Sequence, residues 1–172
     1  MIITEPNIVL QPKEKGGEVT LQQKENPCII VDVGQGNTCT ISNIRMLLKG
    51  PNKDSDPQSF QADMEFEKQG NEKCMLEFFT HKPDEMYCII LLKSGTLRLN
   101  KCTLSLDGIF RETYRKVPCL TVLSKASIEM VDCKFKGDTT NDANTAGIVA
   151  INADVDIRNC TLHHFKSGGI MV

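Results

Sequence analysis

CIILLKSGTLRLNKCTLSLDG, which starts at Cys88, is the first of three similar copies that decide the fold of this chain. CLTVLSKASIEMVDCKFKGD starts at Cys119, GIVAINADVDIRNCTLHHFKS starts at Gly147, and GIMV begins a fourth copy at Gly169. Successive copies start 31, 28 and 22 residues apart. Each copy holds three short apolar-rich runs, which are too short to bury a hydrophobic face alone. The copies must therefore stack on one another.

Apolar and polar residues alternate in the second run of each copy. Leu97 and Leu99 flank Arg98, and the same pattern recurs at 128–130 and 155–157. A period of two indicates a strand with one face turned inward. The intervals are too short for crossover helices, so the pattern predicts an all-β, right-handed parallel β-helix solenoid with three strands per coil.

Earlier segments extend the same pattern toward the N-terminus. Residues 8–10 and 19–21 read as short strands on either side of a polar turn, and they form an expected first coil. Residues 28–33 match the first run of the later copies, and residues 39–41 match the second. About five coils are therefore expected in a single domain that covers residues 1–172.

One column of the repeat predicts the backbone at a corner. Asn43, Lys101, Asp132 and Asn159 each come just before an inward Cys or Ile, between the second and third runs. Asn and Asp tolerate left-handed backbone angles better than other non-glycine residues. We expect tight corners here, with a somewhat different corner at Lys101.

The cysteines fall at equivalent positions of the copies instead of in loops. Cys102, Cys133 and Cys160 share one column, and Cys88 and Cys119 are assigned to another. The chain holds eight cysteines but no CxxC pair, and its histidines have no zinc-like spacing from them. We expect free buried thiols, with no metal and no cofactor, in a reducing intracellular compartment, the cytoplasm.

The composition of the chain limits the classes of partner that it is expected to bind. A net charge of -2 and a pI near 5.9 argue against general nucleic-acid binding. No apolar run approaches the ~18 residues of a membrane span, and the N-terminal residues lack the features of a signal peptide. We expect one cytoplasmic domain with no membrane span.

The repeat resembles the pectate-lyase-like β-helix superfamily. The segment DIRNCTL in the third copy is similar to the I-x-N-C-x-I/L repeats of intracellular β-helix domains, such as those of F-box adaptors and the SHC SH2-binding protein. The resemblance covers essentially the whole chain and implies a parallel β-helix. Many secreted members of this superfamily act on acidic polysaccharides, so the resemblance also implies such an activity.

A long insertion at residues 51–84 interrupts the first full coil. Its residues 60–66 alternate apolar and polar side chains, and an apolar run follows a polar turn, so a β-hairpin or flap is expected. The insertion is either a structural lid on the solenoid or an arm that binds a partner. It should emerge on the same side as the linkers at 107–117 and 137–146.

The chain stops at residues 167–172, after the first run of a new coil, and it begins without a capping segment. We expect either a fragment of a longer chain or ends that are closed by another copy or another protein. The candidate partner-binding residues are Phe60, Met64, Phe66, Phe78, Phe79, Arg111, Tyr114, Arg115, Ile170 and Val172.

Glu129 and Asp156 could form a pair of carboxylates stacked on neighbouring coils, with Arg98 one coil below. An ion pair between Arg98 and Glu129 on a solvated face is the simpler interpretation. Aromatic residues make up only 5% of the chain, Trp is absent, and no polygalacturonase-like Asp motif is present. Of His163 and His164, at most one should face outward from the strand, with the other in a corner or the core.

The function expected from these features is a non-enzymatic scaffold or adaptor module that mediates protein–protein interaction or assembly. No catalytic, cofactor-binding or metal-binding residue is assigned. The alternative is a carbohydrate-binding or polysaccharide-active β-helix of the lyase or hydrolase type.

Overall fold

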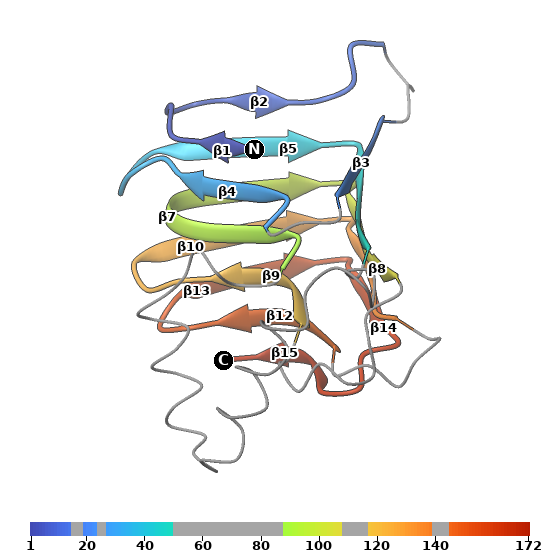
Figure 1. Cartoon of the computed structure of the whole chain (residues 1–172). Coiled ribbons are helices and arrows are strands. Elements are labelled where there is room, and N and C mark those ends of the chain that lie inside the picture. Colours follow the sequence, from blue (N-terminus) through green and yellow to red (C-terminus); the bar gives the residue numbers. More distant parts are fainter. Residues whose placement is uncertain (15–18, 24–26, 50–87, 108–116, 139–144) are drawn as a thin grey trace, which may run out of the picture.

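The computed structural model describes residues 1–14, 19–23, 27–49, 88–107, 117–138 and 145–172. Within these ranges the protein is all-β, without a helix, and every strand pairing is parallel. The strands stack from the N-terminal end of the molecule to the C-terminal end, as in a parallel β-solenoid (Figure 1). None of the described segments forms a helix that could cross a membrane.

The strands pair in three parallel ladders. The first ladder is β1 (Ile2–Ile3), β4 (Ile29–Asp32), β7 (Ile90–Asn100), β9 (Val117–Val122), β12 (Thr145–Ala150) and β15 (Gly168–Met171). The second is β2 (Val9–Leu10), β5 (Thr38–Ser42), β7, β10 (Ala126–Val131) and β13 (Asp154–Arg158). The third is β3 (Val19–Gln23), β6 (Ile44–Lys49), β8 (Thr103–Asp107), β11 (Lys134–Lys136) and β14 (Thr161–His163). The strands expected near residues 8–10 and 19–21 are present as β2 and β3.

Strand β7 belongs to two ladders because its backbone turns at Gly95. Its first part pairs with β4 and its last part with β5. Gly95 has a φ of +83°, and a Cβ there would lie 2.5 Å from Val33 Cγ2. The left-handed angle and the close packing together require glycine at this turn.

The interior is built from columns of apolar side chains. In the first ladder, Ile29, Ile90, Leu120, Ile148 and Ile170 lie opposite one another from strand to strand. The first four are buried in the core cluster, whereas Ile170 is 46% exposed at the end of the column. Each strand therefore covers the apolar side chains of the strand before it.

The outward column of the same ladder is also mostly apolar. It runs Ile30, Leu91, Thr121, Val149 and Met171, and its middle three residues are buried. A parallel sheet that is buried on both faces reads as a continuous apolar run, without alternation. This explains why the first run of each copy lacks the polar residues found in the second.

The second ladder shows the expected alternation. Leu97, Leu99, Ile128 and Met130 are buried in the core. Their counterparts in β13, at residues 155 and 157, are partly buried. The period of two at these positions is thus confirmed.

The Cys102, Cys133 and Cys160 column lies along the interior. Cys102 and Cys133 are 1% exposed, and Cys160 is partly exposed. The Cys133 thiol donates to the carbonyl of Leu99 at 3.4 Å, and its N–H donates to Cys160 Sγ at 3.3 Å. The neighbouring Cys102 thiol and burial raise the pKa of Cys133. These cysteines act as small apolar residues whose thiols bond to nearby carbonyls.

The assignment of Cys88 and Cys119 to one column is wrong. The pairing register places Ile90 opposite Leu120, which offsets the two strands by one residue. Cys119 packs in the main core, whereas Cys88 packs with Leu91 in a separate cluster. The two cysteines therefore occupy different columns and different clusters.

The corner column is confirmed, with one correction. Asn43, Asp132 and Asn159 have φ values of 56°, 54° and 52°, in the left-handed region. Lys101 has a φ of 52°, so its corner is the same and not the different one that was expected. The Asn159 side-chain amide donates to the Asp132 carboxylate, which links two stacked corners.

Substitution of Cys133 tests the interior column. Cys133→Asp places a carboxylate among the Leu99 and Val131 carbonyls, and we expect it to unfold the protein. Cys133→Ala should cost about 1–2 kcal/mol of the free energy of unfolding, and Cys133→Ser, which keeps a donor, a similar amount or less. Urea denaturation measures all three. Equal stability of the Asp and Ala variants would show that residue 133 faces solvent.

Lys101→Asn tests the corner. A non-glycine residue in the left-handed region is strained, and Asn relieves part of that strain. We expect the free energy of unfolding to rise by about 0.5–1 kcal/mol. Lys134→Asn is the matched control, because Lys134 lies in a strand and Asn is unfavourable there. The account fails if Lys101→Asn lowers the melting temperature as much as the control does.

Candidate functional site

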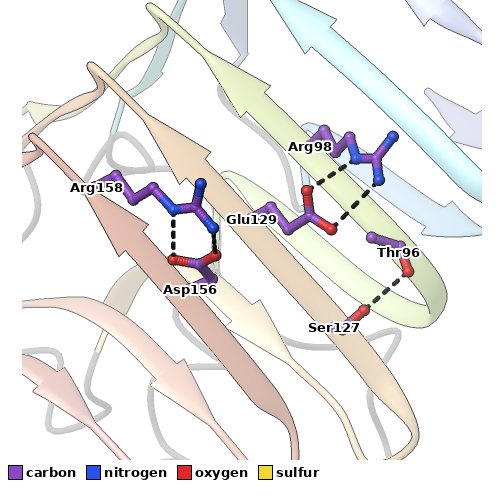
Figure 2. Close-up of polar contacts among 6 residues, drawn as sticks. All are labelled: Thr96, Arg98, Ser127, Glu129, Asp156 and Arg158. Atoms are coloured by element: carbon purple, nitrogen blue, oxygen red, sulfur yellow. Dashed lines mark hydrogen bonds and ion pairs between the residues drawn. The ribbon is translucent and has the colours of Figure 1, made fainter.

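Polar side chains lie in register on the outer face of the second ladder. Arg98 on β7 lies opposite Glu129 on β10, and Glu129 lies opposite Asp156 on β13. They point outward because the residues on either side of each of them face the core. Figure 2 shows these side chains on three neighbouring strands. The stacked carboxylate pair expected from the sequence is confirmed.

Each of the two carboxylates is held by an arginine. Arg98 Nε donates to Glu129 Oε2 at 2.9 Å, and Arg98 Nη2 donates to Oε1 at 3.4 Å. Arg158 Nε donates to Asp156 Oδ1 at 3.2 Å, and its Nη2 donates to Oδ2 (Figure 2). Hydrogen bonding to Asp156 and its charge raise the pKa of the Arg158 guanidinium. The predicted ion pair between Arg98 and Glu129 is confirmed, and the pair at Asp156 was missed.

Hydroxyl groups continue the polar face beside the charges. Thr38, Thr96, Ser127 and Asp154 lie opposite one another along the ladder. Thr96 Oγ1 and Ser127 Oγ are 2.8 Å apart and share a hydrogen bond (Figure 2). The outer face therefore offers donors and acceptors at the regular spacing of the strands, about 4.8 Å.

Both carboxylates of the outer face are engaged in ion pairs on an exposed surface. General acid catalysis needs a carboxyl group that keeps its proton, which burial or a nearby like charge provides. Neither Glu129 nor Asp156 is buried, and each pairs with a guanidinium group instead. Within the described ranges, no group of three or more His, Cys, Asp or Glu residues could hold a metal ion.

A second surface, on the third ladder, was not found from the sequence. We call it the cationic face, and it consists of Lys134, Lys136, His163 and His164. Lys134 and Lys136 are exposed on either side of the fully buried Phe135. Lys136 lies opposite His163. The signal in the sequence was the alternation of Lys, Phe and Lys. In a strand with Phe135 facing the core, this alternation places both lysines on the outer face.

The two histidines contact each other. His163 Nδ1 and His164 Nδ1 are 2.7 Å apart, and the rings meet edge to face with centroids at 4.6 Å. His164 has a φ of 62°, so it lies at a corner, as expected for one of the pair. Partial desolvation and the positive charges of His164 and Lys136 lower the pKa of His163.

The candidate partner-binding residues fall into two groups. Phe60, Met64, Phe66, Phe78, Phe79, Arg111, Tyr114 and Arg115, like the predicted hairpin at 51–84, lie outside the described residues. Ile170 and Val172 are described, and they are 46% and 92% exposed. Of the residues predicted from the sequence, the structure thus places these two at the surface.

The other large apolar side chains exposed in the described ranges are also found on edge strands or next to them. They are Met1, Ile2, Val9 and Val19, of which the last three belong to β1, β2 and β3. Strands β1, β2 and β3 are the first strands of the three ladders, and β15, which carries Ile170, is the last strand of the first ladder. Exposed apolar surface therefore gathers at the two ends of the stack.

Comparisons with protein-family models, with characterised proteins and with solved structures find no match to this chain.

The ion pair on the outer face can be tested by a double-mutant cycle. Arg98→Ala, Glu129→Ala and the double variant should give a coupling free energy of at most about 1 kcal/mol, because both side chains are half exposed. The coupling should shrink in 1 M salt. Chemical denaturation provides the values. A coupling well above this range would indicate a buried network that the exposed geometry does not allow.

Proposed function

We propose that the chain is a right-handed parallel β-helix with three strands per coil and about five coils. The support is the order of the strands along the chain. The chain passes through the first ladder, then the second, then the third, and it repeats this cycle. Right-handed connections between parallel strands are strongly favoured. On this proposal β15 begins a sixth turn.

We propose that this solenoid is a non-enzymatic module that binds proteins and supports assembly. The observation that carries the proposal is the exposed apolar surface on the edge strands at both ends of the stack. Ile170 continues an inner column that is buried in the four preceding strands, yet it is 46% exposed. Such a side chain is part of a core that lacks its next layer in the described structure.

Edge strands also offer backbone groups for pairing. Among the described strands, β15 pairs with β12 and β1 pairs with β4, and neither has a second neighbour. A free edge with apolar side chains is a template for another strand. A strand from a second copy or from a partner protein would supply both backbone hydrogen bonds and an apolar cover.

The alternative function is the binding or cleavage of a polysaccharide. One observation favours it, namely the in-register carboxylates of Glu129 and Asp156 on an outer sheet face. Against it, each carboxylate is neutralised by a guanidinium, Arg98 or Arg158. We therefore rank protein binding above carbohydrate chemistry.

A reducing, cytoplasmic location fits this proposal. The seven described cysteines are free thiols. Burial raises the pKa of Cys28 to about 11 and that of Cys88 to about 12, so both thiols stay protonated at neutral pH. Protonated buried thiols react slowly, which suits a structural role in a cell interior.

Charge placed on the edge tests the proposed function. Ile170→Asp combined with Val172→Asp should shift the sedimentation-equilibrium mass of this 172-residue chain toward the monomer, because a charge opposes strand addition at an edge. Lys13→Asn combined with Lys125→Asn is the control, because it lowers the net charge by the same two units and both lysines are exposed and lie outside β12 and β15.

Two results would count against the proposal. One is an unmodified chain that stays monomeric at every concentration and captures only proteins that the edge variant also captures. The other is saturable binding of an acidic oligosaccharide that Glu129→Gln abolishes, which would favour the carbohydrate alternative.

A further inference from the structure

The cationic face on β11 and β14 differs from the rest of the outer surface. On the second ladder, Arg98 and Arg158 each face a carboxylate. On the cationic face, Lys134 and Lys136 form no salt bridge within the described part of the chain. The neighbours of these lysines across the ladder are hydroxyl residues and His163. Among the described residues, positive charge is therefore left without a matching anion on this face, in a chain whose net charge is -2.

The spacing of the two lysines is set by the strand. Lys134 and Lys136 are two residues apart on β11, with Phe135 turned into the core. Two residues along a strand span roughly 6.6 Å. An extended peptide presents its own alternate side chains at the same spacing, so acidic residues at positions i and i+2 match the two ammonium groups.

Neighbouring strands add further donors. Thr103 and Thr161 flank Lys134 in its column, and both have side chains at least partly exposed. His163 lies beside Lys136. The described residues of this face include no aromatic ring other than the two histidines, which gives nucleotide bases or sugar rings little to stack on.

We propose that the cationic face binds an extended acidic segment of a partner protein, with acidic residues at alternate positions over Lys134 and Lys136. This inference rests on the proposed protein-binding function and names one of its contacts, at a place distinct from the edge strands. The peptide lies along β11, and its carboxylates replace the missing anions.

The histidine pair makes this binding depend on pH. With the two Nδ1 atoms 2.7 Å apart, one of them donates and the other accepts, so the second ring cannot also carry a proton on its Nδ1. The charged and titratable groups that act on His163 are His164 beside it and Lys136 on β11. A bound carboxylate favours the protonated form, so the pKa of His163 rises on binding and affinity increases as the pH falls toward 5.5.

Fluorescence anisotropy with a labelled 12-residue peptide of alternating Glu and Thr tests the proposal on the whole chain. We expect saturable binding at low salt that weakens in 0.5 M salt. Lys134→Glu combined with Lys136→Glu should weaken it at least about tenfold. The matched control is Lys13→Glu combined with Lys125→Glu, which changes the net charge equally and should leave the affinity within about twofold. His163→Gln should remove the gain between pH 7.5 and pH 5.5.

Two outcomes would contradict the proposal. Equal weakening by the two double variants would mean that only net charge matters. Tighter binding of single-stranded DNA or of a sulfated oligosaccharide, with loss in the Lys134/Lys136 variant, would assign the face to another class of polymer. Loss of peptide binding leaves the sedimentation of the edge-strand variant unaffected, so failure here is distinguishable from failure of the proposed function. Circular dichroism checks that each variant folds.

Discussion

Hydrogen bonding between parallel strands of successive copies is the constraint on which the rest of the structure depends. The N–H of Lys134 donates to the carbonyl of Cys102, and the N–H of Thr161 donates to the carbonyl of Cys133, both at 2.9 Å. Once this register is set, the alternation of side chains assigns each residue to the core or to a face. The apolar columns, the corner residues and the charged faces all follow from it.

Much of this architecture could be predicted from the sequence, because repetition and a period of two are local signals. The interior positions of Leu97, Leu99, Ile128 and Met130 follow from alternation alone, and the corner at Asn159 follows from residue type. The first run of each copy carried no alternation, since its ladder is buried on both faces. That loss of signal is why Cys88 was placed one residue out of register.

The surfaces were harder to predict, since they depend on which strands become neighbours. Glu129 could be matched to Arg98 because both occupy equivalent places in two copies. The pair of Arg158 and Asp156 lies within one strand, where side chains two residues apart share a face, and it was overlooked. The cationic face needed the register of β11 with β14, which places Lys136 opposite His163. Neither residue alone suggested a site.

The register itself is the most direct test of this account. Scalar couplings across hydrogen bonds, measured by NMR, report which amide nitrogen bonds to which carbonyl carbon. The account predicts a coupling between Lys134 N and the Cys102 carbonyl, and another between Thr161 N and the Cys133 carbonyl. Couplings shifted by one residue, or a well-dispersed spectrum that lacks both, would contradict the stacking from which every surface described above is derived.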